Sequence, residues 1–305
     1  MKLQQLNYIR EITRRDLSIS AAADALHTSQ PGISNQVQLL EHELGFKIFE
    51  RHGKRLVDLT PAGKLVIDMA DRVLLDIENI KQLAADTRND QTGTLSIGTT
   101  HTQARYALPK AIKAFSQRYP KVHLNMVQGT PTEIAEMAAT GKVDIAIATE
   151  GLGQFDRLVI LPCYQWNRSI VVPPDHPLLD EKQLTLESIY HYPILTYVMG
   201  FTGRAQQDQA FIEKGLTPNV VFTATDADVI KTYVELGLGI GIIASMAFDP
   251  VKDAPLQGRD ASHLFKTSTT QLGIRRGSYL RSYGYAFIEL LAPQLTKHVV
   301  QTAIA

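Results

Sequence analysis

Residues 17–59, LSISAAADALHTSQPGISNQVQLLEHELGFKIFERHGKRLVDL, decide the fold of the N-terminal part of this chain. The stretch predicts an Ala-rich helix over residues 19–26, a polar turn, and a second helix that begins at Gln30 and ends near Gly45. A short hairpin follows, and it carries three cationic residues, Arg51, Lys54 and Arg55. This order is typical of a winged helix-turn-helix with its motif at about 19–38, in which the second helix enters the DNA major groove.

Local chemistry supports both helices of the motif. Ser18 and Ser29 are suited to be N-caps, and Pro31 fits a first turn, where its missing N–H costs nothing. Apolar residues predicted to face inward recur at helical spacing in Ile33, Val37, Leu40 and Leu44. The polar face suits hydrogen bonds to base edges and phosphates, which makes candidate DNA contacts of Ser29, Gln30, Pro31, Ser34, Asn35 and Gln36. Arg51, Lys54 and Arg55 would hold the flanking phosphates; the alternative is a helical hairpin with a solvated polar face.

The composition sets limits on function. There are 31 basic and 31 acidic residues, so attraction to DNA must come from local clusters and not from a global positive field. The N-terminal segment is an amphipathic helix without a secretory apolar region, and no apolar run approaches the roughly 20 residues that span a bilayer. The single cysteine, Cys163, lies in an apolar stretch and is expected to be a buried structural thiol. We therefore expect a cytoplasmic protein.

Residues 60–89 predict a long linker helix that starts at Thr60 and Pro61 as N-cap and first residue. Its apolar positions form a narrow seam close to a heptad repeat, in Val66, Met69, Val73, Ile77, Ile80 and Ala84. Such a seam requires a partner, either the helix's own domain or the same helix of a second subunit. We favour the second subunit, because a dimer lets two recognition helices contact two half-sites.

From residue 90 to residue 305 strands and helices alternate, which predicts parallel sheets covered by helices. Three strands, near 94–99, 122–128 and 143–148, enclose two helices. A second group of strands follows, and the last helix is predicted over 279–291. The chain is thus expected to be α/β after its helix-rich N-terminal domain (1–59), with two lobes joined by crossovers near 149–156 and 265–271. The first lobe would take about 93–150 and 270–305, and the second about 158–264.

Three strand-to-helix junctions in this region are rich in hydroxyl and amide side chains, in Thr100, Thr102, Gln103, Thr149 and Thr202. Ligands of open α/β sheets bind at the carboxyl ends of strands, and helix N-termini attract anions. The junctions therefore predict a site for a small oxyanion or a short polar acid, although such residues also serve simply as helix caps. No nucleophile elbow, metal-spaced His/Cys cluster or P-loop accompanies them, and His101 has no catalytic partners in sequence.

The chain resembles the LysR-type transcriptional regulators over its whole length, and among them most closely those that control sulfur assimilation and cysteine biosynthesis. The segments that carry this resemblance include MKLQQLNYI (1–9), TSQPGIS (28–34), TTHTQARYALP (99–109), PCYQWNRSIVV (162–172), GFTGR (200–204) and TATDADVIKTY (223–233). The resemblance implies a dimer or tetramer, a two-lobed effector module similar to periplasmic binding proteins, and an activator that contacts RNA polymerase. It also implies that Asn35 replaces a cation of the relatives' recognition helix.

For the effector module, the resemblance implies an acetylserine-type inducer and the opposing small anions sulfate and thiosulfate, with no resident cofactor or metal. Effector contacts carry over onto Thr100, Thr102, Gln103, Thr149 and Thr202, and Trp166 onto the inducer response. A related regulator of sulfonate use is the nearest alternative. A transport solute-binding protein and an enzyme of amino-acid metabolism are more distant, because the former does not carry a helix-turn-helix and the latter needs a catalytic constellation.

Overall fold

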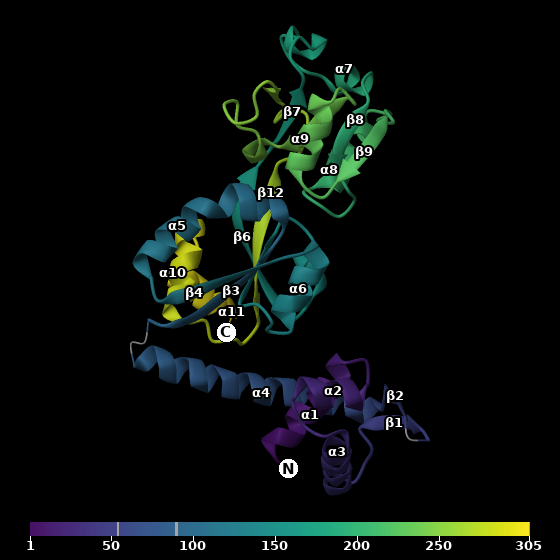
Figure 1. Ribbon diagram of the computed structural model, residues 1–305, viewed down its shortest axis with the longest axis vertical. Coiled ribbons are helices and arrows are strands. Elements are labelled where there is room, and N and C mark those ends of the chain that lie inside the picture. The colour runs from purple at the N-terminus through teal and green to yellow at the C-terminus, as the bar shows by residue number, and fades with distance from the viewer. Residues whose placement is uncertain (54, 89–90, 305) are drawn as a thin grey trace. The chain divides into compact units, whose positions relative to one another are not determined.

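The computed structural model describes residues 1–53, 55–88 and 91–304 (Figure 1). The chain separates into two compact units, Met1–Arg88 and Asn89–Ala305, which are taken one at a time. The first unit holds the predicted DNA-binding domain and the linker helix, and the second holds the predicted effector module. None of the described helices is both long and apolar enough to cross a membrane.

The N-terminal unit is a winged helix-turn-helix followed by one long helix. Its elements are α1 (Leu3–Arg14), α2 (Ile19–Ala25), α3 (Gln30–Leu44), β1 (Phe49–His52), β2 (Arg55–Leu59) and α4 (Pro61–Thr87). The predicted caps are confirmed: Ser18 Oγ accepts a hydrogen bond from the Ala21 N–H, and Ser29 Oγ accepts one from the Gly32 N–H. Strands β1 and β2 pair antiparallel and form the wing.

The predicted inner stripe of α3 forms the centre of this unit. Ile33, Val37 and Leu40 are completely buried, and they belong to one apolar cluster with residues of α1 and α2. Burial of side chains of this size stabilises a fold by about 1.5–3 kcal/mol each. Packing of this stripe leaves the opposite, polar face of α3 to solvent.

Helix α4 has two apolar sides with different surroundings. Ile67, Ala70 and Leu74 are buried against the domain. The predicted seam lies elsewhere on the helix, and much of it is exposed: Met69 by 54%, Val73 by 41% and Ile80 by 65%. Val66, at the start of the seam, packs against the apolar cluster of the domain, whereas Met69, Val73 and Ile80 are left available to another chain.

The second unit contains two five-stranded sheets. The first has the order β4-β3-β5-β12-β6, from strands β3 (Gly93–Thr99), β4 (Val122–Gln128), β5 (Ile145–Ala148), β6 (Leu158–Trp166) and β12 (Ser268–Arg275). Strands β3, β4 and β5 are parallel, as predicted, whereas β12 runs antiparallel to both of its neighbours. The helices of this lobe are η1 (Gln103–Ala107), α5 (Leu108–Arg118), α6 (Pro131–Ala139), η2 (Leu152–Gln154), α10 (Ser282–Leu291) and α11 (Lys297–Ile304).

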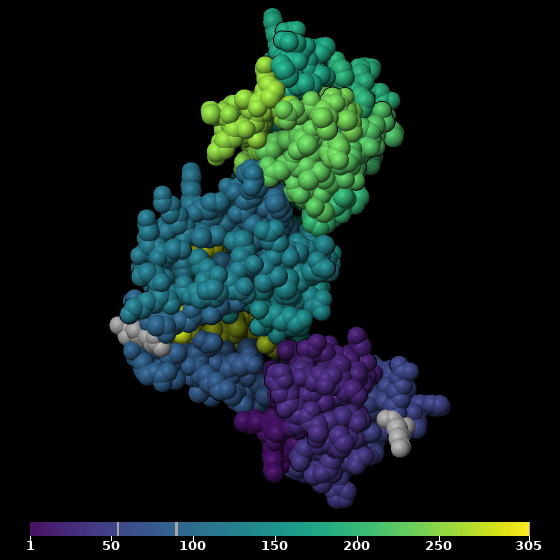
Figure 2. Space-filling model, viewed as in Figure 1, coloured from purple at the N-terminus to yellow at the C-terminus, as the bar shows by residue number. Residues whose placement is uncertain are grey.

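The second sheet has the order β11-β7-β10-β8-β9. Its strands are β7 (Arg168–Val172), β8 (Ile194–Tyr197), β9 (Val220–Ala224), β10 (Ile240–Ala244) and β11 (Gln257–Asp260). Helices η3 (Pro177–Leu179), α7 (Leu186–Tyr190), α8 (Arg204–Glu213), α9 (Ala227–Glu235) and η4 (Ser245–Ala247) complete the lobe. In Figure 2 this lobe is a body of green and yellow-green residues, while yellow C-terminal residues show among the blue ones of the first lobe.

The predicted boundary at the start of the second lobe, near residue 158, was wrong. Strand β6 does not open the second lobe; it pairs along its whole length with β12 in the first sheet, with Leu158 opposite Arg275 and Trp166 opposite Ser268. The crossovers therefore lie at Asn167 and between Phe265 and Ser268. The error has one cause: residues 268–271 were assigned to a crossover, so the long partner strand of β6 was not recognised.

Candidate DNA interface and effector site

The polar face of α3 is accessible within its own unit. Ser29, Gln30, Pro31 and Asn35 are exposed, and Ser34 is half-buried. A hydroxyl- and amide-bearing face of this kind can donate and accept hydrogen bonds at base edges. In the wing Arg55 is exposed, while the predicted phosphate contact Lys54 lies outside the described residues.

Two of the predicted DNA contacts are engaged inside the domain. The Gln5 side chain of α1 donates a hydrogen bond of 3.2 Å to Gln36 Oε1, which fixes the Gln36 amide. Arg51 Nη2 lies 3.8 Å from the carboxylate of Glu41, and only 22% of the Arg51 side chain is exposed. Arg51 is therefore directed back toward α3, so Arg55 is the better-placed phosphate contact of the two.

Glu41 connects the recognition helix to the wing. Its carboxylate is fully buried, lies 3.1 Å from Lys47 Nζ, and accepts hydrogen bonds from the N–H groups of Ile48 and Phe49. Charge-assisted hydrogen bonds to backbone donors are stronger than neutral ones. The start of β1 is thus held at a defined place relative to the C-terminal end of α3.

Five of the six predicted effector residues gather at or just after the ends of β3, β5 and β6 in the first lobe: Thr100, Thr102, Gln103, Thr149 and Trp166. Thr100, Thr102 and Gln103 are buried where β3 passes into η1, a π-helical turn. The Gln103 amide nitrogen lies 3.5 Å from the Thr149 hydroxyl and donates to the Thr270 hydroxyl at 3.2 Å. Gln103 therefore links two of the three predicted junctions.

Trp166 joins the same group through Thr270. Its indole N–H donates a hydrogen bond of 3.1 Å to Thr270 Oγ1, the atom that also accepts from Gln103. The phenol of Tyr164, on β6, donates to the Gln103 amide oxygen. Trp166, which the resemblance assigns to the inducer response, is thus linked to Gln103 through the shared acceptor Thr270.

The third junction, which belongs to the second lobe, lies beside Glu150. Thr202 is 95% buried, since only 5% of its surface is exposed, and it has the left-handed backbone conformation (φ 49°). The N–H of Gly203, the N-cap of α8, donates a hydrogen bond of 2.9 Å to the Glu150 carboxylate. The turn that carries Thr202 is therefore linked to the first lobe through Gly203 and Glu150, the residue after Thr149.

The Thr102 hydroxyl is buried, and it interacts with the phenol of Tyr197. Tyr197 belongs to β8, so this contact joins the two lobes.

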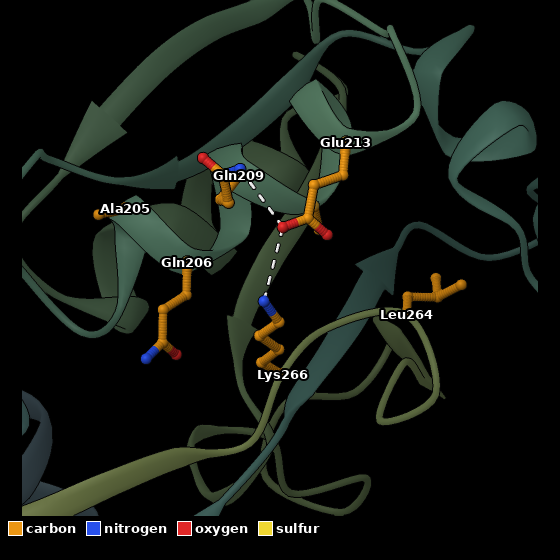
Figure 3. A pocket seen from close by; sticks show the side chains of 7 residues that line it. Ala205, Gln206, Gln209, Glu213, Leu264 and Lys266 are labelled. Carbon is orange, nitrogen blue, oxygen red and sulfur yellow. Dashed lines mark hydrogen bonds and ion pairs between the residues drawn. The ribbon is translucent and has the colours of Figure 1, made fainter.

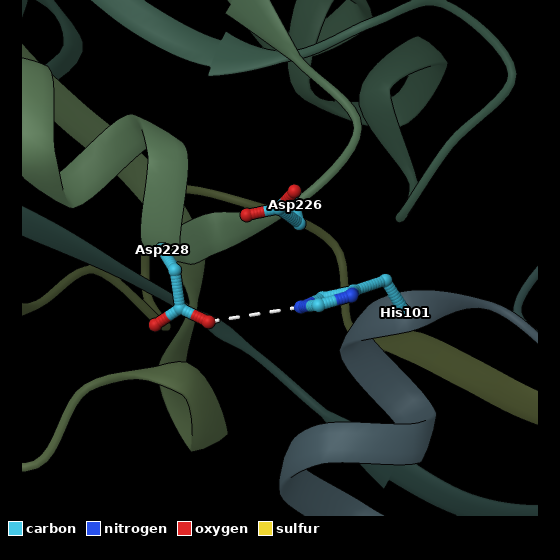
Figure 4. Close-up of side chains that lie close together, drawn as sticks. All are labelled: His101, Asp226 and Asp228. Carbon is cyan, nitrogen blue, oxygen red and sulfur yellow. Dashed lines mark ion pairs between the residues drawn. The ribbon is translucent and has the colours of Figure 1, made fainter.

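A second polar group connects the lobes next to this site. Asp228 on α9 contacts Arg105 Nε at 2.5 Å and Lys231 Nζ at 3.3 Å. It also lies 3.6 Å from His101 Nε2 (Figure 4). His101, Asp226 and Asp228 could each offer a ligand atom to a cation, within 4.8 Å of one another. Because Asp228 already contacts two cationic side chains, this arrangement favours an inter-lobe ion-pair network over a metal site.

A separate hollow of about 340 Å³ lies on the second lobe, beside α8 (Figure 3). Lys266 and Glu213 line it and lie 3.5 Å apart, and Gln209 donates to the same carboxylate. None of the six predicted effector residues lines this hollow. Glu213 balances the Lys266 charge, which weakens the attraction of this hollow for an anion.

Cys163 is buried on β6, and burial raises the pKa of its thiol to about 12. The thiolate is the reactive form of cysteine, so this side chain is inert at neutral pH. The interpretation of Cys163 as a structural residue agrees with this environment.

Sequence reasoning missed several residues of the site: Tyr164, Arg168, Ser268 and Thr270. They lie within β6, β7 and β12, and a polar residue in a strand pattern normally indicates a solvated face. Only the antiparallel pairing of β6 with β12 places Thr270 opposite Tyr164.

Comparison with known proteins agrees with this architecture. Residues 3–64 match the family described as bacterial regulatory helix-turn-helix protein, lysR family, and residues 88–296 match the LysR substrate binding domain. The regulator SsuR of Burkholderia cenocepacia is 50% identical over 97% of this chain and 96% of its own length. The regulator CysB of Haemophilus influenzae is 51% identical over 99% of this chain and 94% of its own.

A solved structure gives the same result for the second unit. The cofactor-binding domain of the Cbl transcriptional regulator is 46% identical to this chain and superposes on it with a TM-score of 0.68. The alignment covers 70% of this chain and 94% of the Cbl domain. The helix-turn-helix is covered by the family match to residues 3–64. The chain therefore belongs to the LysR family: it is a DNA-binding transcriptional regulator and not an enzyme.

Proposed function

We propose that this regulator controls genes of sulfur assimilation and cysteine biosynthesis, mainly as an activator, and that its effector site binds an acetylserine-type inducer and small sulfur oxyanions. The observation that carries the proposal is the buried group of hydroxyl and amide side chains around Gln103, which links Thr149, Thr270 and Trp166. Side chains of this kind offer several hydrogen-bond donors to the oxygens of a small ligand.

The chemistry of the site suits a compact oxyanion. Neutral hydroxyl and amide donors and the N-terminal N–H groups of a helix bind sulfate-like ligands without a direct ion pair. Thr202 stands immediately before the N-cap of α8, and Thr100 follows the end of β3. Both positions favour a small anion with several acceptor oxygens over an apolar ligand.

We infer that the ligand acts by changing how the two lobes close on each other. Its contacts come from both lobes, because Thr100, Thr102 and Gln103 belong to one and Thr202 to the other. A ligand shifts such an equilibrium only as far as its affinities for the two arrangements differ. In a regulator bound to DNA as an oligomer, altered closure would change subunit geometry and contact with RNA polymerase.

The exposed seam of α4 supports a dimer as the unit that binds DNA, and two such dimers would form a tetramer. Exposed Met69, Val73 and Ile80 repeat at spacings of four and seven residues along one side of the helix. That spacing matches a two-stranded coiled coil. Two paired copies of α3 would contact two half-sites of double-stranded DNA.

The decisive experiment combines calorimetry with footprinting. The purified protein is titrated with sulfate, thiosulfate and acetylserine, and DNase footprints are recorded on DNA upstream of sulfur-assimilation genes with and without acetylserine. We expect binding of at least one of these ligands and a protected region whose extent changes with acetylserine. Absence of binding for all three ligands would overturn the proposed effector class, and absence of protection the proposed targets.

Regulation of sulfonate use is the second candidate. Two differently named relatives, SsuR and CysB, match this chain almost equally, at 50% and 51% identity, so overall similarity does not separate specialised regulators. The same footprinting assay distinguishes them. Selective protection upstream of sulfonate-utilisation genes would favour this candidate.

A further inference from the structure

Arg168, the first residue of β7, is a buried cation next to the proposed effector site. Only 2% of its surface is exposed. Its Nη2 donates a hydrogen bond of 2.7 Å to the Gly203 carbonyl and lies 3.2 Å from Ser268 Oγ, while Nη1 lies 3.3 Å from the Lys266 carbonyl. The guanidinium therefore contacts the turn that carries Thr202 and also the crossover that ends at β12.

Aromatic rings enclose the same guanidinium. Its central carbon lies 5.3 Å from the ring centre of Trp166 and 5.6 Å from that of Phe265. Trp166 stands before the first crossover and Phe265 before the second. Arg168 thus touches both chain segments between which the lobes can move, in addition to the Thr202–Gly203 turn.

The Arg168 charge has no direct counterion. Its partners are carbonyl and hydroxyl oxygens, and no described carboxylate forms an ion pair with it. Glu150 attracts it from a distance, but that carboxylate is occupied by the Gly203 N–H. Burial lowers the pKa of Arg168 to about 10, so the side chain remains positively charged at neutral pH. Burying a charge without a counterion is costly, and a bound anion nearby would reduce that cost.

Gly203 shows how closely the turn and the guanidinium fit. Its backbone is left-handed (φ 68°), and a Cβ atom at this position would lie 2.2 Å from Arg168 Nη2. Gly200, in the same turn region, is also left-handed (φ 81°) but would place a Cβ in open space. The two glycines therefore allow the contact with Arg168 to be tested separately from backbone strain.

We propose that Arg168 is a positioning residue of the effector site that also makes the site selective for anions: it fixes the Thr202–Gly203 turn and supplies the positive charge that balances the bound ligand. This inference rests on the proposed effector function. Because the same guanidinium contacts both crossovers, it connects occupancy of the site to the segments that control lobe closure.

The test is calorimetric titration of sulfate into the full-length protein and its variants. Arg168→Gln keeps hydrogen-bonding groups but removes the charge, and we expect its sulfate affinity to fall about 10- to 100-fold. Arg168→Lys keeps the charge but loses the planar fork, so it should recover a large part of that loss. The control is Arg259→Gln, which removes an arginine that donates to the carbonyls of Leu178, Leu179 and Glu181 in the same lobe.

Unchanged sulfate affinity in Arg168→Gln would overturn the inference. An equal loss of sulfate affinity in Arg168→Lys and Arg168→Gln would overturn it as well, because it would indicate a purely structural role for the side chain. Should the Arg168 variants fail to fold, Gly203→Ala displaces the guanidinium and keeps its charge. Gly203→Ala is expected to weaken sulfate binding at least tenfold more than Gly200→Ala, and equal effects would contradict the proposal. A wild-type protein that binds none of the three effectors would overturn the proposed function and this inference together, whereas wild-type binding unaffected by these variants would remove the inference alone.

Discussion

The phenol of Tyr106 donates a hydrogen bond of 2.7 Å to the carboxylate of Asp228, and Lys231 Nζ lies 3.2 Å from the same phenol oxygen. Tyr106 belongs to η1 in the first lobe, whereas Asp228 and Lys231 belong to α9 in the second. The turn that begins with Gln103 thus also carries the inter-lobe contact. Any ligand that moves η1 must change this contact.

Replacement of Tyr106 by Phe keeps the ring and removes both polar contacts. A hydrogen bond to a charged group contributes about 1.5–3 kcal/mol, so we expect a loss of stability of that order or less in the effector module. Hydrogen exchange of backbone amides in η1 and α9 should become faster. Tyr190→Phe, at a partly exposed tyrosine on α7, is the control. Unaltered exchange in Tyr106→Phe would show that the contact does not hold the lobes together.

The pH dependence of this contact follows from its two charged members. Burial opposes ionisation of Asp228, but the Tyr106 hydrogen bond and the Lys231 charge outweigh it and hold the pKa of Asp228 below its ordinary 3.8. Burial likewise disfavours charged Lys231, but the hydrogen bonds that Lys231 donates to Asp253 and Tyr106 raise its pKa above the ordinary 10.5.

A carboxylate whose pKa is lowered in the folded state stabilises the fold at pH values above its ordinary pKa, and this stabilisation is lost as the pH falls through its pKa in the folded protein. A lysine whose pKa is raised stabilises the fold at pH values below its ordinary pKa, and this stabilisation is lost as the pH rises through its pKa in the folded protein. The Tm difference between wild type and Tyr106→Phe should therefore be the same at about pH 7.5 and about pH 9. It should shrink near pH 3. A difference that varies between the two higher values would contradict this assignment.

Thr100→Val tests the pocket directly. The substitution keeps the shape of the side chain and removes its hydroxyl, so ligand binding should weaken by roughly 1–3 kcal/mol while DNA affinity stays unchanged. Calorimetry with sulfate and acetylserine measures the first effect and a gel-shift titration the second. Thr217→Val, at an exposed position, is the control. Full retention of affinity in Thr100→Val would place the ligand elsewhere.

In the wing, Arg51 and Arg55 are expected to behave differently. Arg55 is exposed, so Arg55→Gln should reduce the slope of log affinity against log salt concentration by about one unit. Arg51 is directed toward Glu41, so Arg51→Gln should change the slope less. DNA-binding titrations over a range of salt concentrations measure both. A larger effect for Arg51 than for Arg55 would refute the assignment drawn from the Glu41 contact.

The seam of α4 is tested by Ile80→Asp. Ile80 is 65% exposed, so a charge there is tolerated by the folded chain alone but would be buried in a coiled coil. Light scattering should show a shift toward monomers with little change in the melting of the helix-turn-helix. Glu78→Asp, at an exposed neighbour, is the control. An oligomeric state unaffected by Ile80→Asp would exclude this side of α4 from the interface.

Local signals in the sequence were sufficient wherever neighbouring residues determine the structure. Ser18, Ser29 and Thr60 were predicted as N-caps, and each side chain accepts the expected backbone hydrogen bond. A cap involves residues only three positions apart, so a short window contains all the necessary information. The same is true of the inner stripe of α3.

Long-range pairing was the part that the sequence could not supply. Strand β12 is far along the chain from β6, and without that pairing β6 was assigned to the wrong lobe. Arg168 escaped notice for a related reason: a cation at the start of an apolar strand is normally solvated, and only the packed fold encloses it. Likewise, the hydrogen bond from Gln5 that engages the predicted DNA contact Gln36 depends on the packing of two separate helices.

Cys163 has a practical consequence for experiments on lobe closure. The chain has only this one sulfhydryl, and it is buried on β6. Maleimide dyes should therefore leave the native protein unlabelled, so a cysteine introduced at an exposed site in each lobe would give a doubly labelled sample without prior removal of the natural one. Energy transfer between such dyes would report opening and closing of single molecules as ligand is added.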